Sequence, residues 1–158
     1  MTKPILRVGK IRRTGRATPG SVGAHLSRTR PTANADPDRQ DLNEWLIGSA
    51  GMDLAAAIDA VHRKAGVVPR ADAVLANDLL LTVSPDWFRP GNPDGVGTWD
   101  EDRLRTFRAE AEAFLVKTFG RQRVVAAVLH LDEATPHIQA VVVPILRGRG
   151  GQGTRLSS

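Results

Sequence analysis

The stretch that decides the fold is VVAAVLHLDEATPHIQAVVVPIL, residues 124–146. Two apolar runs flank a short acidic segment that contains a proline. Apolar runs of strand length, rich in β-branched residues and separated by a turn, are typical of paired antiparallel strands. We therefore expect a β-hairpin with strands at 123–132 and 137–146.

Four polar side chains interrupt these runs close to the turn: His130, Asp132, His137 and Gln139. If the loop spans residues 133–136, His130 lies directly opposite Gln139. Because side chains alternate along a strand, all four then project from the same face of the hairpin. The other side chains near the turn are expected to face a core: Leu129, Leu131 and Ile138.

Two imidazoles and an amide oxygen on one face can bind a divalent metal ion. We predict that His130, His137 and Gln139 are the ligands of such an ion. These donors suit Mn²⁺, Mg²⁺ or Zn²⁺, so the ligand set alone leaves the metal open. The alternative is a hairpin with ordinary polar residues on a solvent face, which explains a single histidine better than a matched set beside one turn.

Away from the hairpin, the apolar pattern alternates between strand and helix periods, which predicts an α/β chain. The clearest helix is at 98–120, where Thr98 and Glu101 predict a capping box and Gly120 predicts the end. Its expected buried residues are Leu104, Phe107, Ala111, Phe114 and Leu115. The other expected elements are a strand at 4–13, a helix at 22–30, a loop at 31–43, a helix at 52–66, a strand at 73–85 and a loop at 86–97.

The positive charge gathers at the two ends of the chain. Residues 1–30 carry eight basic and no acidic residues, whereas the middle of the chain is acidic. This distribution indicates a polyanion bound at one place. The predicted DNA-binding residues are Arg7, Lys10, Arg12, Arg13, Arg28 and Arg30. The basic, glycine-rich end at 147–158 is expected to be a flexible tail after a single folded domain at 1–146.

Composition excludes several classes of site. The 158 residues include no cysteine, which excludes disulfides, thiolate metal sites and cysteine nucleophiles, and agrees with a cytoplasmic setting. The chain also has no tyrosine, so a covalent reaction on DNA would need another nucleophile. No apolar run is long enough to span a membrane.

A second group of candidate residues lies in the basic N-terminal segment. His25 and Arg28 are three positions apart, which places them on one face of a helix. Taken alone, this spacing is common on surface helices. In a tyrosine-free chain, however, the neutral imidazole of His25 is the leading candidate for a nucleophile.

These motifs together resemble those of a known family. HLDEATPHIQ at 130–139, with HLSR at 25–28 upstream, resembles the plasmid mobilisation relaxases of the Mob/Pre type, also called plasmid recombination enzymes. That family lies within the endonucleases named for a histidine-hydrophobe-histidine motif. LLLTVSPDWF at 79–88 and the final RLSS also look like this family, so the resemblance covers nearly the whole chain.

The resemblance implies a fold and an activity. The expected fold is an antiparallel sheet of about five strands with packed helices and a metal site on its open face. The expected enzyme nicks one DNA strand at a plasmid transfer origin and stays bound to the 5′ phosphate. His25 stands at the position of the nucleophile, Arg28 would bind the scissile phosphate, and Glu133 would assist the histidine or the metal. Residues 1–146 would then form the relaxase catalytic domain.

The sequence departs from the family pattern at Gln139, where a third histidine is usual. A glutamine oxygen is a harder ligand than imidazole, which favours Mn²⁺ or Mg²⁺ over Zn²⁺. Other readings remain open: a non-catalytic DNA-binding accessory protein, a replication-type nickase, and a metal phosphodiesterase that uses water. A second copy of the chain or the transfer machinery are expected further partners.

Overall fold

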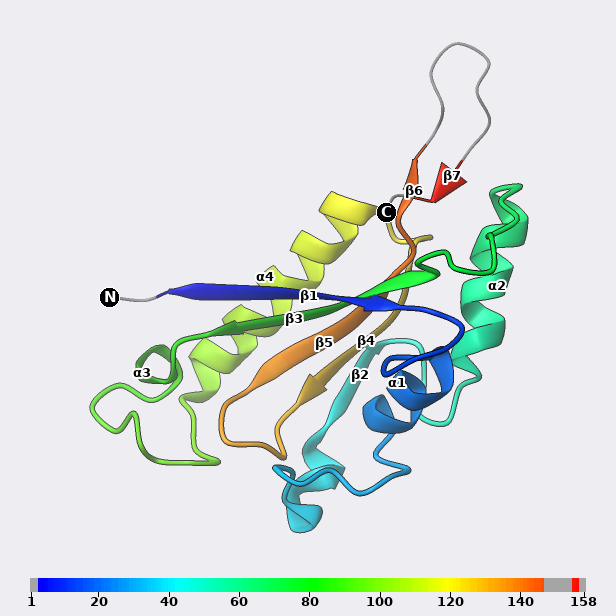
Figure 1. Cartoon of the computed structure of the whole chain (residues 1–158). Coiled ribbons are helices and arrows are strands. Elements are labelled where there is room, and N and C mark those ends of the chain that lie inside the picture. Colours follow the sequence, from blue (N-terminus) through cyan, green and yellow to red (C-terminus); the bar gives the residue numbers. More distant parts are fainter. Residues whose placement is uncertain (1–2, 147–154, 157–158) are drawn as a thin grey trace.

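A five-stranded antiparallel sheet forms the centre of the protein, in the order β1-β3-β5-β4-β2 (Figure 1). The computed structural model describes residues 3–146 and 155–156. The predicted hairpin is present as β4 and β5, which pair at inner positions of the sheet. The strands are β1 (Pro4–Ile11), β2 (Glu44–Ile47), β3 (Ala76–Val83), β4 (Val124–His130) and β5 (His137–Val142).

Helices cover both faces of the sheet. The long helix α4 packs on one face, and α1 and α2 pack on the other. Both faces of the central strands are therefore buried, as expected for strands with continuous apolar runs. The helices are α1 (Pro19–Leu26), α2 (Leu54–Lys64), α3 (Pro85–Phe88) and α4 (Glu101–Phe119), with a 3₁₀ helix at Pro37–Leu42.

Alternation along the strands divides the core into two clusters. Leu129 and Ile138 point toward α4 and contact the cluster that includes Leu115. Val128 points the opposite way, into the cluster that α1 and α2 cover, which includes Ile58. The expectation that the metal site lies on an open face is therefore wrong, because α1 and α2 pack on the same face as His130 and leave that residue with no exposure.

Helix boundaries follow local capping chemistry. Thr18 and Ser21 form a capping box at the start of α1. Asp53 caps α2 by accepting a hydrogen bond from the Ala56 amide. The predicted capping box of Thr98 and Glu101 is wrong, because α4 begins at Glu101 and Asp100 accepts the capping hydrogen bond from the Arg103 amide.

Other expectations need correction. The end of α4 at Gly120 is confirmed, and this glycine has a φ of 85°. Phe114 was expected in the buried stripe but is 41% exposed and lies edge-on to Phe119. The expected loop at 31–43 contains the 3₁₀ helix, and the strand β2 directly after it was missed. β2 has only four residues, which is too short for a clear alternating pattern.

The hairpin register also differs from the prediction. His130 pairs with His137 rather than with Gln139, so the connecting loop spans 131–136 and is two residues longer than expected. A shift of two residues preserves the face on which each side chain lies, whereas a shift of one would have reversed it.

The end of the described chain returns to the body of the protein. Arg155–Leu156 form β7, which pairs with β6 (Ile145–Leu146). The predicted flexible tail at 147–158 therefore includes this short strand, and the rest of it lies outside the described residues. The tail and the single folded domain at 1–146 stay predictions. Within the described ranges, no helix has both the length and the apolar character needed to cross a membrane.

Candidate active site and metal centre

The closed end of the β4–β5 hairpin brings two histidines face to face. His130 ends β4, His137 begins β5, and their ring centroids are 5.3 Å apart. Gln139 lies on the same face, one alternation further along β5. The three residues are 0%, 7% and 8% exposed, in that order. The three predicted metal ligands thus share one buried surface.

The ring nitrogens of this pair are suited to a metal ion. Neither nitrogen of His130 has a hydrogen-bond partner, although both are buried. The Nδ1 of His137 lies 3.1 Å from the carbonyl oxygen of Thr135, so Nδ1 carries the proton and the Nε2 lone pair is free. Burial lowers the pKa of His130 to about 3, and the Arg28 charge contributes. His130 is therefore neutral at pH 7, as a metal ligand must be.

Gln139 supplies the third candidate donor. Within the described part of the chain, no three His, Asp or Glu side chains are placed to hold one ion. The Gln139 amide is on the right face, and its nitrogen lies 2.9 Å and 3.0 Å from the two carboxylate oxygens of Asp78. The amide oxygen of Gln139 is thus the atom that remains available to bind a metal ion. Two imidazoles and this oxygen fit a hard or borderline divalent ion.

His25 approaches the hairpin from the last turn of α1. Its ring centroid lies 6.1 Å from that of His130, and the two rings are tilted by 59°. Burial lowers the pKa of His25, the charge of Arg28 lowers it further, and the charge of Glu133 opposes both. The imidazole is therefore neutral at pH 7 and retains a lone pair that can attack an electrophile.

Arg28 connects His25 to the loop at 131–136. Its side chain is 4% exposed, and its Nε and Nη2 donate to the two carboxylate oxygens of Asp132 at 2.8 Å and 2.9 Å. Nη2 also donates to Oε1 of Glu133 at 2.8 Å. Nη1 donates to the His25 carbonyl oxygen at 3.0 Å and lies 3.3 Å from His25 Nε2. In this structure the guanidinium, which the resemblance assigned to the scissile phosphate, contacts two carboxylates.

The backbone of Arg28 is unusual. Its φ of 54° is the one positive value at a non-glycine position in the described residues. A left-handed conformation costs an ordinary residue on the order of 1 kcal/mol. The five contacts of the guanidinium offset this cost and fix the side chain beside His25.

The two acids of the motif place negative charge beside the histidines. Burial alone would raise the pKa of Asp132, but hydrogen bonds from Arg28 and Asn43 lower it to about 2. Oδ1 of Asp132 lies 3.8 Å from His130 Nδ1. Oε1 of Glu133 lies 3.8 Å from His137 Nε2. This charge favours a cation next to the free ring nitrogens.

Side chains from three other segments hold the loop at 131–136 in place. Arg39 comes from the 3₁₀ helix, Arg89 follows α3 and is 6% exposed, and Thr82 belongs to β3. The acceptors are the carbonyl oxygens of Leu131 (3.0 Å from Arg39), Ala134 (3.0 Å from Arg89) and Pro136 (2.7 Å from Thr82). The loop that carries Asp132 and Glu133 is therefore preorganised.

The predicted DNA-binding residues do not form one cluster. Arg7 is exposed and pairs with Leu80, the neighbour of Gln139, so it lies on the face of the histidines. Lys10 points to the opposite face, on the side of α4. Arg30, in the loop after α1, is exposed, and its charge contributes to the lowered pKa of His25.

Arg12 and Arg13 are held by a loop of the protein itself. Their guanidinium groups donate to the carbonyl oxygens of Asp72 at 2.5 Å and Arg70 at 2.6 Å. The structure therefore places these two arginines apart from the histidine pair, although both remain exposed to solvent.

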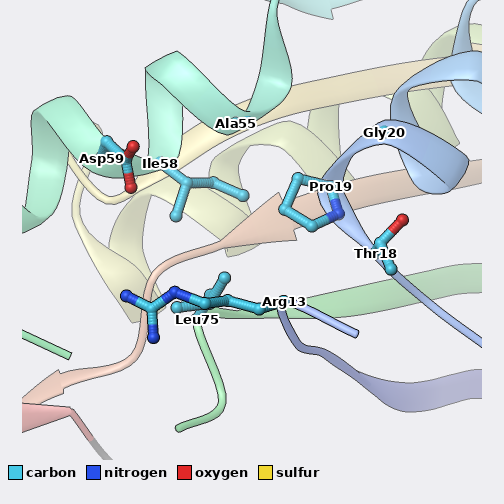
Figure 2. A pocket seen from close by; sticks show the side chains of 8 residues that line it. All are labelled: Arg13, Thr18, Pro19, Gly20, Ala55, Ile58, Asp59 and Leu75. Carbon is cyan, nitrogen blue, oxygen red and sulfur yellow. The ribbon is translucent and has the colours of Figure 1, made fainter. Parts of the chain in front are cut away.

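Arg13 borders a pocket of about 340 Å³ between the end of β1, the start of α1 and α2 (Figure 2). Ile58 and Leu75 supply apolar surface, and Asp59 lies above the Arg13 side chain in the view. The pocket is at the first turn of α1, whereas His25 is in the last. It is therefore distinct from the histidine site.

Sequence reasoning missed Asp78, Arg39 and Arg89 as parts of the site. Asp78 sits in an otherwise apolar strand, and a charged residue in such a run is a signal that could have found it. Arg39 and Arg89 act on the loop through backbone carbonyl oxygens. Every residue has a backbone carbonyl oxygen, so such a contact requires no particular residue type as acceptor. No sequence pattern therefore pointed to these two arginines.

Comparison with known proteins agrees with this geometry. The family model described as plasmid recombination enzyme matches residues 1–157. A 65 kDa protein of Zymomonas mobilis is 32% identical over 142 residues, which are 89% of this chain and 23% of the relative. Plasmid recombination enzyme type 2 of Staphylococcus aureus is 26% identical over 152 residues, 94% of this chain and 34% of the relative. The chain thus spans about a third or less of the length of these relatives.

Among solved structures, the chain is similar to the MobM relaxase domain bound to plasmid pMV158 oriT DNA, in a Mn-bound crystal at pH 5.5. The two share 26% sequence identity with a TM-score of 0.73, over 98% of this chain and 74% of that chain. A Mn-bound crystal of the same domain at pH 4.6 gives a TM-score of 0.72. Family match, fold and motif agree, and this chain belongs to the family of plasmid recombination enzymes.

Proposed function

We propose that this chain is a metal-dependent relaxase domain that nicks one DNA strand at a plasmid transfer origin. The cut strand stays joined by its 5′ phosphate to His25. The observation that carries this proposal is the position of His25, 6.1 Å from a buried histidine whose two ring nitrogens have no partner. The oriT DNA and Mn in the MobM relaxase domain support the choice of substrate and of metal.

The attacking atom is His25 Nε2. Arg28 can only donate hydrogen bonds, so the ring nitrogen that faces its Nη1 is the one that carries the lone pair, and Nη1 must release that lone pair before Nε2 can attack. The proton of the neutral ring is then on Nδ1. A phosphate that approaches Nε2 also meets the positive charge of Arg28, so Arg28 orients the nucleophile and attracts the substrate.

The cleavage step conserves atoms and charge. A bond forms between Nε2 of His25 and phosphorus, while the bond from phosphorus to the 3′ oxygen breaks. The 3′ hydroxyl gains one proton, and His25 Nδ1 gives up one. Because one phosphate bond replaces another, the same site can reseal the strand.

A divalent ion held by His130, His137 and Gln139 would polarise the phosphate and stabilise the charge that develops on it. Glu133 can assist either the nucleophile or the metal. It accepts a hydrogen bond from Arg28, which contacts His25, and it lies 3.8 Å from Nε2 of the proposed ligand His137. Mn²⁺ or Mg²⁺ is the ion that we propose. The proposed setting is the cytoplasm, and contacts with a second copy or with transfer proteins remain a prediction.

The test is to incubate the protein with Mn²⁺ and a pool of single-stranded oligonucleotides, next to His25→Ala, and to follow adducts by denaturing gel and intact mass. We expect a metal-dependent adduct that His25→Ala does not form. An oligonucleotide set that includes the pMV158 oriT strand serves as a defined substrate.

The other outcomes identify the alternatives. Cleavage without an adduct would contradict the histidine intermediate and indicate a phosphodiesterase that uses water. Salt-sensitive binding of the defined strand without cleavage would indicate an accessory DNA-binding protein. Sequencing the captured strands would separate a transfer origin from a replication origin.

A further inference from the structure

Asp78 is a half-buried carboxylate on the same sheet face as the histidine pair, and the proposed mechanism does not use it. On β3 it lies diagonally across from Gln139 of β5, a separation that long side chains can bridge. On its other side, β1 contributes Gly9, which has no side chain to share the space. The carboxylate therefore faces Gln139.

The hydrogen bond between these residues has only one sensible orientation. A carboxylate can only accept, so the Gln139 nitrogen must face Asp78, at 2.9 Å and 3.0 Å from its two oxygens. If the amide turned over, its oxygen would meet the carboxylate and the two would repel. The other end of the amide, the oxygen, is then fixed on the side away from Asp78.

The charge of Asp78 has no local structural explanation. Within the described residues, no Lys, Arg or His lies within ion-pair distance of it, and its hydrogen-bond partner is a neutral amide. Burial raises the pKa of Asp78, and the Gln139 hydrogen bond opposes this. A half-buried charge with a neutral partner destabilises the fold, and a nearby bound cation would offset that cost.

We propose that Asp78 is a positioning residue that locks the Gln139 amide with its oxygen toward the metal. This inference rests on the proposed function, because it assumes that Gln139 is a ligand. A metal ion at the oxygen would also polarise the amide N–H groups and strengthen their bond to Asp78. Asp78 thus allows a glutamine to serve where the family usually has a histidine.

The test is Mn²⁺ titration of metal-free protein by calorimetry, for Asp78→Leu, Gln139→Leu and the double variant. Loss of an outer-shell partner typically weakens metal binding about 10- to 100-fold, so we expect Asp78→Leu to raise the Mn²⁺ Kd by about tenfold or more. In the Gln139→Leu background, adding Asp78→Leu should change the Kd less than about twofold. Glu110→Gln, an exposed charge change on α4, is the matched control and should bind like wild type.

Two results would overturn the inference. One is wild-type affinity in Asp78→Leu. The other is an equal effect of Asp78→Leu in both backgrounds, that is, the same loss of Mn²⁺ affinity in Gln139→Leu protein as in wild-type protein. Asp78 would then act on the metal through its charge or as a direct ligand, and not through Gln139. If Asp78→Leu fails to fold, Asp78→Asn replaces it: its side-chain oxygen can still accept the bond, so a smaller loss is expected, and no loss at all counts against the inference.

A metal-free readout separates this inference from the proposed function. The side-chain amide of Gln139, assigned by its absence in Gln139→Leu, should exchange slowly with solvent in wild-type protein and quickly in Asp78→Ala, which has no acceptor for it. Equal exchange rates would refute the lock even if the metal binds. If the Gln139 amide exchanges slowly but wild-type protein binds no Mn²⁺, the proposed function is wrong, whereas the Asp78–Gln139 contact is still supported.

Discussion

At the scale of single residues, the chemistry of His25 depends on which ring nitrogen carries the proton. Arg28 settles this by placing a hydrogen-bond donor 3.3 Å from Nε2. It also binds Asp132 and Glu133, so one side chain links His25, the proposed nucleophile, to the loop beside the proposed metal ligands. The roles proposed for His25, Glu133 and the three ligand residues come from short motifs. The role of Arg28 as an internal link could not be predicted in this way, because the motif does not show which groups the guanidinium contacts.

We expect His25 to titrate below the ordinary histidine pKa of 6.5, because burial and the charge of Arg28 disfavour the protonated ring. The neutral nucleophile then persists as the pH falls through 6.5, and adduct formation should decline only at lower pH. NMR titration of the ring protons in metal-free protein measures this directly, with His25→Ala for assignment. Arg30→Gln, which removes a charge that lowers this pKa, should move the midpoint upward. A wild-type midpoint at or above 6.5 would contradict the prediction.

Gln139→His should tighten metal binding, because imidazole is a stronger ligand than an amide oxygen and Asp78 can accept the Nδ1 proton of the new ring. We expect roughly tenfold tighter binding, on the order of 1.4 kcal/mol. Calorimetric titration with Mn²⁺ and with Zn²⁺ measures the change, and Zn²⁺ should gain more. Gln122→His, at an exposed position, is the control. Identical titrations for Gln139→His and wild type would mean that Gln139 is not a ligand.

At the scale of elements, the hairpin shows what a sequence pattern can and cannot specify. Its two strands and the face of each polar residue follow from alternation, which depends only on the strand period. Its register does not, because the loop is stabilised by Arg39, Arg89 and Thr82 from distant segments. The observed loop at 131–136 is therefore as compatible with the local sequence as the expected loop at 133–136.

The strand β1 offers a matched pair of substitutions. Arg7 and Lys10 are both exposed and lie three residues apart, but Arg7 faces the histidine side of the sheet and Lys10 the α4 side. Arg7→Ala should weaken binding of single-stranded DNA and reduce the salt slope by about 0.7, the value for one lost phosphate contact. Lys10→Ala should leave the DNA affinity and its salt slope nearly unchanged. Fluorescence anisotropy at several salt concentrations tests this, and equal effects would mean that the DNA does not distinguish the two faces.

At the scale of the whole molecule, one sheet joins two separate hydrophobic clusters. Alternation predicted which side chains of the hairpin share a face, but not that a second cluster covers the face of the histidines. The strand count of about five agrees with the structure. The placement of α1 and α2 over the face of the histidines could not be predicted, since an amphipathic pattern shows which side of a helix is buried but not which face of the sheet it covers. That placement buries the site and positions His25.

Because the two clusters share the sheet, the domain should unfold in one cooperative step. Leu115→Ala on α4 and Leu54→Ala on α2 remove equally buried side chains on opposite faces. Each should destabilise the protein by about 2–5 kcal/mol and shift one common transition. Urea unfolding followed by circular dichroism and by tryptophan fluorescence provides the check. Two separate transitions in either variant would show that the clusters unfold independently.

The strand order has a consequence for how the protein is made. Translation produces β1, β2 and β3 first, yet β3 and β2 meet in the sheet only through β5 and β4, the last of the five to be synthesised. A nascent chain that ends before Val142 already carries His25 and Arg28, but it has no complete hairpin to place beside them. Incomplete products released early from the ribosome should therefore lack a working site. A chain would then acquire the proposed nicking activity only when its synthesis has passed the central hairpin.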